Sequence, residues 1–128
     1  MYTCDGSNTS PELGWAGLPS DTVETAVIVT DLDAEGSCWV VYSIDPSITN
    51  LALGQVPEGV SQAVNSFGNA RYDGPCPPSG TTHAYLIEVY ALGQQLEIPD
   101  GAPASEVIEA VQFASLAQVS LLGNYTRP

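Results

Sequence analysis

The segment from His83 to Leu92 constrains the fold most strongly, because its residues divide into two faces with a period of two. Successive residues of a β-strand point to opposite sides of a sheet, so this alternation predicts a strand over residues 83–92. One face carries His83, Tyr85, Ile87, Val89 and Ala91, and the other carries Ala84, Leu86, Glu88, Tyr90 and Leu92. His83 is the only histidine of the chain and is the first residue of this predicted strand.

Further strands are predicted near residues 2–4, 23–31, 38–44 and 119–125, with clusters of Gly, Pro, Asn and Asp between them. The strands at 23–31 and 38–44 flank an acidic turn. Residues 45–82 are expected to form an ordered loop with short strands or turns. One helix is predicted over residues 105–117, where Ser105 is the expected cap and apolar residues recur at helical spacing. These are Val107, Ile108, Val111 and either Ala114 or Ser115. The expected class is therefore mainly β.

A loop rich in proline and glycine leads into the strand that begins at His83. Prolines restrict φ and glycines permit unusual φ, so this loop is expected to be preorganised in the manner of a binding loop. Together with other motifs it resembles the phosphatidylethanolamine-binding protein family, and most closely the small prokaryotic Raf-kinase-inhibitor-like branch. The motifs are Tyr2-Thr3-Cys4-Asp5-Gly6, Trp15, Asp31-Leu32-Asp33, Asn65-Ser66-Phe67-Gly68, Gly74-Pro75-Cys76-Pro77-Pro78, His83-Ala84-Tyr85 and Leu121-Leu122-Gly123-Asn124-Tyr125.

The resemblance implies one domain over residues 1–128, built as a β-sandwich of two antiparallel sheets with a C-terminal helix against one of them. It also implies a small pocket that binds an anion such as phosphate, acetate or a phospholipid headgroup. In that pocket two aspartates orient and hydrogen-bond, prolines form a wall, and the histidine, tyrosine and tryptophan contact the ligand. The implied pocket residues are Asp31, Asp33, Cys38, Trp39, Gly74, Pro75, Pro77, Pro78, His83 and Tyr85.

Several residues depart from the family pattern. Leu32 and Glu35 replace prolines of the acidic turn, Cys38 replaces a histidine, Ala84 replaces an arginine, and Phe113-Ala114 replaces a Gly-His pair. Lost cations and an added carboxylate disfavour an anion, so weaker anion affinity is predicted. Backbone N–H groups of residues 74–80 could still cradle an oxyanion. Arg71 is either a cation that reaches the pocket or an unpaired surface residue.

His83 admits three interpretations. It is a neutral pocket histidine that donates to Asp31 or Asp33, a structural histidine that satisfies buried polar groups, or a zinc ligand with Cys38, Cys76 and an aspartate. The three cysteines are likewise open. A Cys4–Cys76 disulfide is preferred under oxidising conditions, a Cys38–Cys76 disulfide is the rival, and three reduced thiols are the remaining possibility.

Two alternative functions are retained. Cys38, His83 and Asp31 have the residue types of a nucleophile, a base and its orienter, although carboxylates near Cys38 disfavour a thiolate and the common catalytic motifs are absent from the sequence. No cofactor motif is found. The other alternative is implied by the resemblance: inhibition of a kinase or serine protease by protein contact, through loops such as 45–66 and 93–103.

The charge of the chain excludes some partners. Fifteen acidic residues face two basic ones, which gives a net charge of −13. Nucleic acids and anionic membrane surfaces attract proteins with clustered Lys and Arg, so neither is expected. No apolar run reaches the length of a membrane helix, and no signal peptide is recognised, although an exported protein with its leader removed would look the same. Both a monomer and a homodimer are compatible with the sequence.

Overall fold

The computed structural model describes residues 13–32, 36–51, 59–65 and 82–126. Within these ranges the chain forms seven strands and one helix. In chain order they are β1 (Leu13–Gly14), β2 (Glu24–Asp31), β3 (Gly36–Ile44), β4 (Asn50–Leu51), β5 (Ser61–Gln62), β6 (Thr82–Leu92), α1 (Ala104–Ala114) and β7 (Ser115–Thr126). The mainly β class is therefore confirmed. The strand predicted near residues 2–4 lies outside the described ranges.

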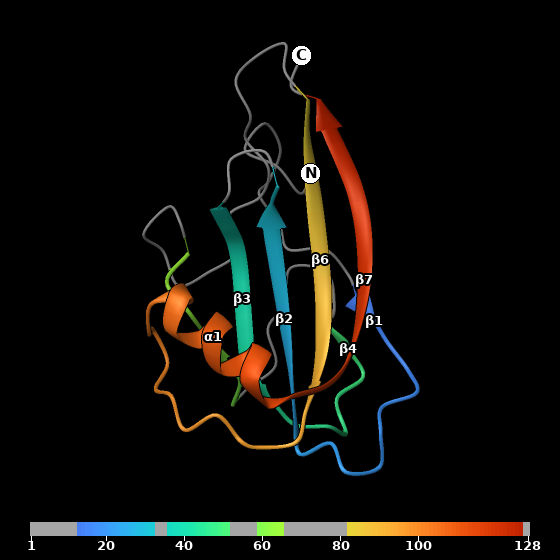
Figure 1. Cartoon of the computed structure of the whole chain (residues 1–128), viewed down its shortest axis with the longest axis vertical. Coiled ribbons are helices and arrows are strands. Elements are labelled where there is room, and N and C mark those ends of the chain that lie inside the picture. The colour runs from blue at the N-terminus through green and yellow to red at the C-terminus, as the bar shows by residue number, and fades with distance from the viewer. Residues whose placement is uncertain (1–12, 33–35, 52–58, 66–81, 127–128) are drawn as a thin grey trace.

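Five of the strands form one antiparallel sheet in the order β5-β3-β2-β6-β7, and β1 pairs with β4 in a second, two-stranded sheet. The four long strands of the larger sheet are those predicted at 23–31, 38–44, 83–92 and 119–125. The short β4 and β5 lie in the segment expected to hold short strands or turns. Helix α1 crosses one face of the larger sheet, in front of β3 and β2 in Figure 1.

Alternating residues of the central strands belong to two separate hydrophobic clusters, one on each face of the larger sheet. Ala26 and Ile28 of β2 belong to the cluster beneath α1, which also contains Tyr90 and Leu92 of β6. The other face carries Val27, Val29, Trp39, Val41 and Ile44, with Ile87 and Val89 packed against them. Trp15 and Ile48, which neighbour the two-stranded sheet, also pack on this face. The predicted division of residues 87–92 into two faces is confirmed.

A β-bulge in β3 interrupts the alternation of side chains between the two faces near the end of that strand. Thr25 pairs with Ile44 and Val27 pairs with Val41, so two steps along β2 correspond to three along β3. Ser43 absorbs the extra residue with a φ of 58°. A bulge of this kind bends the strand and re-aims the side chains that follow it. Ile44 consequently joins Val41 in the same cluster.

Both ends of α1 differ from the prediction. The residue before the helix is Pro103, which makes no side-chain cap, and Ser105 lies inside the first turn. The backbone N–H of Ala104 instead donates to the carbonyl of Val64 at 3.1 Å. A hydrogen bond from a distant part of the chain thus replaces the local cap that the serine suggested.

The helix ends at Ala114 rather than at residue 117, because the residues that follow join the sheet. Ser115 is already extended and pairs with Leu92 of β6. The carbonyl of Ala114 accepts the N–H of Gly93 at 2.9 Å. A Cβ atom on Gly93 would lie 3.0 Å from the side chain of Leu116, so glycine permits this close approach of helix end and strand. The predicted faces of the helix are correct, since Val107, Val111 and Ala114 are buried.

Within the described residues, no helix combines the length and the apolar character needed to cross a bilayer.

Candidate ligand-binding site

Three of the residues predicted for the pocket, Asp31, His83 and Tyr85, lie at one end of the five-stranded sheet. Asp31 is the last residue of β2 and pairs with Tyr85 of β6 on one side and Gly36 of β3 on the other. One residue further, the N–H of Leu32 donates to the carbonyl of Ala84 at 2.9 Å. The antiparallel pairing thus continues one residue beyond the end of β2, as far as Ala84, the chain neighbour of His83.

Of Asp31, Cys38, His83 and Tyr85, the structure describes the backbone. His83 lies two residues from Tyr85, the register partner of Asp31, and so occupies the diagonal position relative to Asp31. Diagonal neighbours of an antiparallel pair are about 7–8 Å apart, within reach of long side chains. The backbone therefore allows the hydrogen bond between Asp31 and His83 that the neutral-histidine interpretation requires.

Cys38 is placed differently. Val29 pairs with Trp39 and Thr30 with Ser37, so Cys38 is the extra residue of a second register shift. Because β2 lies between β3 and β6, Cys38 and His83 are separated by two strand spacings, or about 10 Å across the sheet. They are also offset by about three residues along it, or about 10 Å more. This arrangement disfavours a direct Cys38–His83 contact, whether for catalysis or for zinc.

Trp39 is a core residue of this end of the sheet. Its side chain is 1% exposed and belongs to the cluster on the face opposite α1. Its indole N–H donates to Oε1 of Gln62 at 2.7 Å, which ties β3 to β5. Trp39 thus supports the strands that carry the candidate residues.

The remaining predicted positions lie outside the described residues. They are Asp33, Gly74, Pro75, Pro77 and Pro78, together with Cys4, Cys76 and Arg71. Among the described residues, no group of three or more His, Cys, Asp or Glu side chains is placed to hold a metal ion. The disulfide alternatives and the zinc set that includes Cys76 remain predictions.

A buried carboxylate, which no sequence motif indicates, lies at the opposite end of β2. Glu24 is 4% exposed and accepts two backbone hydrogen bonds, from Ser43 at 3.1 Å and from Leu96 at 3.0 Å. Burial raises the pKa of Glu24, and the two hydrogen bonds partly oppose that rise. The sequence gives no signal for this role, because the two donors are 19 and 72 residues away.

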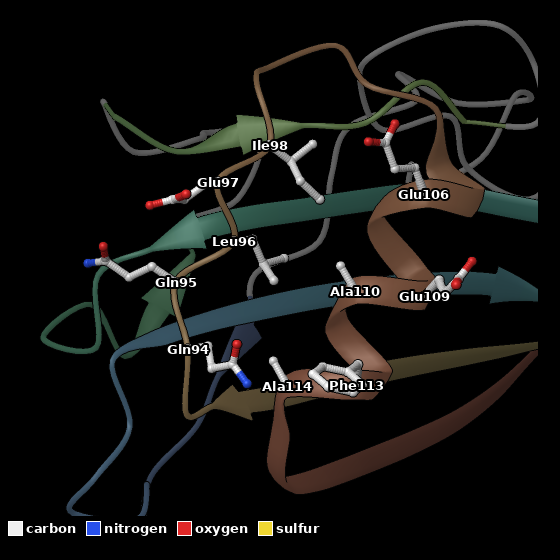
Figure 2. A pocket seen from close by; sticks show the side chains of 10 residues that line it. All are labelled: Gln94, Gln95, Leu96, Glu97, Ile98, Glu106, Glu109, Ala110, Phe113 and Ala114. Atoms are coloured by element: carbon white, nitrogen blue, oxygen red, sulfur yellow. The ribbon is translucent and has the colours of Figure 1, made fainter.

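A groove of about 620 Å³ lies between α1 and the connector that leads from β6 to the helix (Figure 2). Its lining is formed by Gln94, Gln95, Leu96, Glu97, Ile98, Glu106, Glu109, Ala110, Phe113 and Ala114. This lining contains none of the residues predicted for the ligand pocket. The connector belongs to segment 93–103, for which a protein-contact surface is one of the predicted alternatives.

Comparison with known proteins decides the identity of the fold. The sequence profile of the phosphatidylethanolamine-binding protein family matches residues 1–126. The chain belongs to this family. A protein of Methanothermobacter thermautotrophicus from the UPF0098 group is 40% identical over 134 residues, which cover 98% of this chain and 88% of that protein. Escherichia coli YbhB is 34% identical over 133 residues, which cover 95% of this chain and 84% of YbhB.

A solved structure supports the same family assignment. The crystal structure of Escherichia coli YbcL, described as a member of the mammalian family, aligns with a TM-score of 0.91 and 29% identity. The alignment covers 100% of this chain and 86% of YbcL. The predicted membership in the family and in its prokaryotic branch is confirmed.

Proposed function

We propose that this protein binds a small ligand carrying an oxyanion, such as phosphate or a headgroup phosphate, at the sheet end formed by Asp31, His83 and Tyr85. Family membership supports ligand binding. The observation that carries the location is the register, which pairs Asp31 with Tyr85 and holds Ala84 against Leu32. The backbones of these three residues, which come from two neighbouring strands, therefore lie at the same end of the sheet.

The proposed chemistry uses each residue in a distinct way. Asp31 accepts a hydrogen bond from one nitrogen of His83 and so orients the ring, which leaves the second nitrogen for the ligand. The hydroxyl of Tyr85 donates to an oxyanion oxygen. With an alanine at position 84 and a cysteine at position 38, the chain lacks two cationic side chains of the family pattern, so a weaker affinity for an oxyanion is expected.

A thermal-shift titration tests this proposal. Phosphate, acetate and phosphoethanolamine are added at about pH 6 and pH 7.5 to the wild type and to His83→Ala. A ligand that binds the folded state alone stabilises it by RT ln(1 + [L]/Kd), so a millimolar site responds at tens of millimolar ligand. A rise in Tm with an oxyanion that is lost in His83→Ala is the expected result.

A matched pair of tyrosine variants controls for general effects. Tyr85→Phe is expected to weaken binding about fivefold through the lost hydrogen bond. Tyr90→Phe removes the same atom in the same strand, but Tyr90 packs beneath α1 and its hydroxyl donates to Glu88. Tyr90→Phe should therefore leave binding unchanged. The proposed site would be contradicted if the oxyanion did not raise the Tm of the wild type. It would also be contradicted if the Tm of all three variants rose as much as that of the wild type.

A further inference from the structure

The groove beside α1 combines an apolar floor with an exposed rim. Leu96 and Ile98 of the connector pack against the core beneath the helix and, with Ala110, form the floor. In Figure 2 these three side chains lie between the connector and the helix, while Gln95 and Glu97 point away from the helix. Phe113 stands on the rim with 82% of its surface exposed. A large aromatic side chain in this position offers apolar area that no described residue covers.

The connector wall is fixed by hydrogen bonds to three strands. Glu24 of β2 accepts the N–H of Leu96 at 3.0 Å, and the hydroxyl of Tyr42 in β3 donates to the carbonyl of Pro99. Asp100 accepts the N–H of Gln62 in β5 at 2.7 Å. A groove whose walls are held in place binds without the cost of ordering a loop. The groove is therefore preorganised.

The lining has one sign of charge. Glu97, Glu106 and Glu109 contribute carboxylates, and none of the ten lining residues is basic. A concave surface of one charge attracts the opposite charge and repels its own. The apolar floor and the acidic rim together fit an occupant that carries both apolar and cationic groups.

The shape favours a polypeptide over a small molecule. Six of the lining residues are exposed, so the groove is open to solvent, whereas pockets for small molecules enclose most of the ligand surface. Helix α1 has 11 residues and is about 16 Å long, which is the length of about five residues of extended chain. A second copy of this chain has poor charge complementarity, since it contains 2 basic residues against 15 acidic ones.

We infer that this groove docks an extended, basic segment of a partner protein, with a large apolar side chain against Phe113 and flanking lysines or arginines near Glu106 and Glu109. This groove shares no residue with the oxyanion site proposed at Asp31, His83 and Tyr85. Either proposal can therefore be wrong without affecting the other. It would give the protein a second recognition surface that selects for cationic partners.

Fluorescence anisotropy with labelled peptides tests this inference on the full chain. The probe is an acetylated and amidated peptide of alternating lysine and leucine, about six residues long. Two comparison peptides replace all lysines or all leucines by serine. At about 0.1 M ionic strength, both replacements are expected to weaken binding about tenfold or more. Equal binding of either comparison peptide would overturn the inference, because charge or apolar contact would then play no part.

Variants locate the binding. Phe113→Ala is expected to weaken the lysine–leucine peptide about tenfold, and Glu109→Gln about two- to fivefold. Asp21→Asn removes one charge from an exposed residue outside the groove and is the matched control for Glu109→Gln. Because Phe113 is exposed, its replacement should leave the Tm nearly unchanged. If Asp21→Asn weakens binding as much as Glu109→Gln, or if Phe113→Ala has no effect, the groove is not the docking site.

Discussion

Glu24 shows how one residue can join distant segments of this fold. Its carboxylate receives the N–H of Ser43 at the β3 bulge and the N–H of Leu96 in the connector, so it links β2 to both. Buried N–H groups that lose their acceptor cost about 1–3 kcal/mol each. The carboxylate therefore stabilises two irregular segments, although its own ionised form is disfavoured by burial.

The raised pKa of Glu24 sets a direction for the pH dependence of stability. The carboxyl of Glu24 binds a proton more tightly in the folded state than in the unfolded chain, where its pKa is near 4.5. The resulting contribution to the free energy of unfolding is fully present below that value and is lost as pH rises through the folded pKa. Glu24→Gln cannot ionise, so urea unfolding across this pH range should show a smaller decline in the variant than in the wild type.

Asp45 provides a control of opposite sign. Ser47 donates to Oδ1 of Asp45 through its backbone N–H at 2.9 Å, and hydrogen bonds from Ser47 lower the pKa of Asp45. Its contribution is present above the unfolded pKa near 3.8 and is lost as pH falls through the folded value. Asp45→Asn should therefore remove a loss of stability at acid pH. For each substitution, the stability of the wild type minus that of the variant is followed against pH. Differences that change in the same direction for Glu24→Gln and Asp45→Asn would contradict these assignments.

At the scale of elements, the spacing of apolar residues predicted the long strands and the buried helix face. Tertiary contacts determined the helix boundaries and the bulge. The four long strands follow from alternation, and the buried face of α1 follows from helical spacing. The helix boundaries do not, because Val64 caps the first turn and pairing with β6 draws Ser115 into β7. The bulge at Ser43 has no local signature either, since serine is not a residue that favours positive φ.

The bulge leads to a prediction about β3. A residue other than glycine pays about 1–2 kcal/mol for a left-handed conformation, which exceeds the entropic cost of glycine of about 0.5–1 kcal/mol. Ser43→Gly keeps the backbone N–H that donates to Glu24, so it should stabilise the protein by up to about 1 kcal/mol. The urea midpoint measures this change.

The matched control for Ser43→Gly is a serine in ordinary extended backbone. Ser120 pairs with Glu88 in the middle of β7 and is exposed. Ser120→Gly should destabilise the protein by about 0.5–1 kcal/mol, because glycine weakens a strand interior. A loss of stability in Ser43→Gly as large as in Ser120→Gly would show that the positive φ carries no strain.

At the scale of the whole molecule, the sequence led to the family through motifs and to the fold through the family. The resemblance also placed Asp31, His83 and Tyr85 in one pocket, and the register brings their backbones to one sheet end. Segment 93–103 was predicted as part of a protein-contact surface, but its groove with α1 was not. The relative position of connector and helix depends on tertiary contacts of Glu24, Tyr42 and Gln62. The single domain over residues 1–128 and the choice between monomer and homodimer remain proposals.

The most direct test of the proposed function is a two-dimensional amide NMR titration of the assigned full chain with phosphate. Binding at the proposed site predicts saturable shift changes at Asp31, Leu32, Ala84 and Tyr85, with little change along α1. Shift changes confined to other parts of the chain, or none at ligand concentrations of about 50 mM, would contradict an oxyanion site at this end of the sheet.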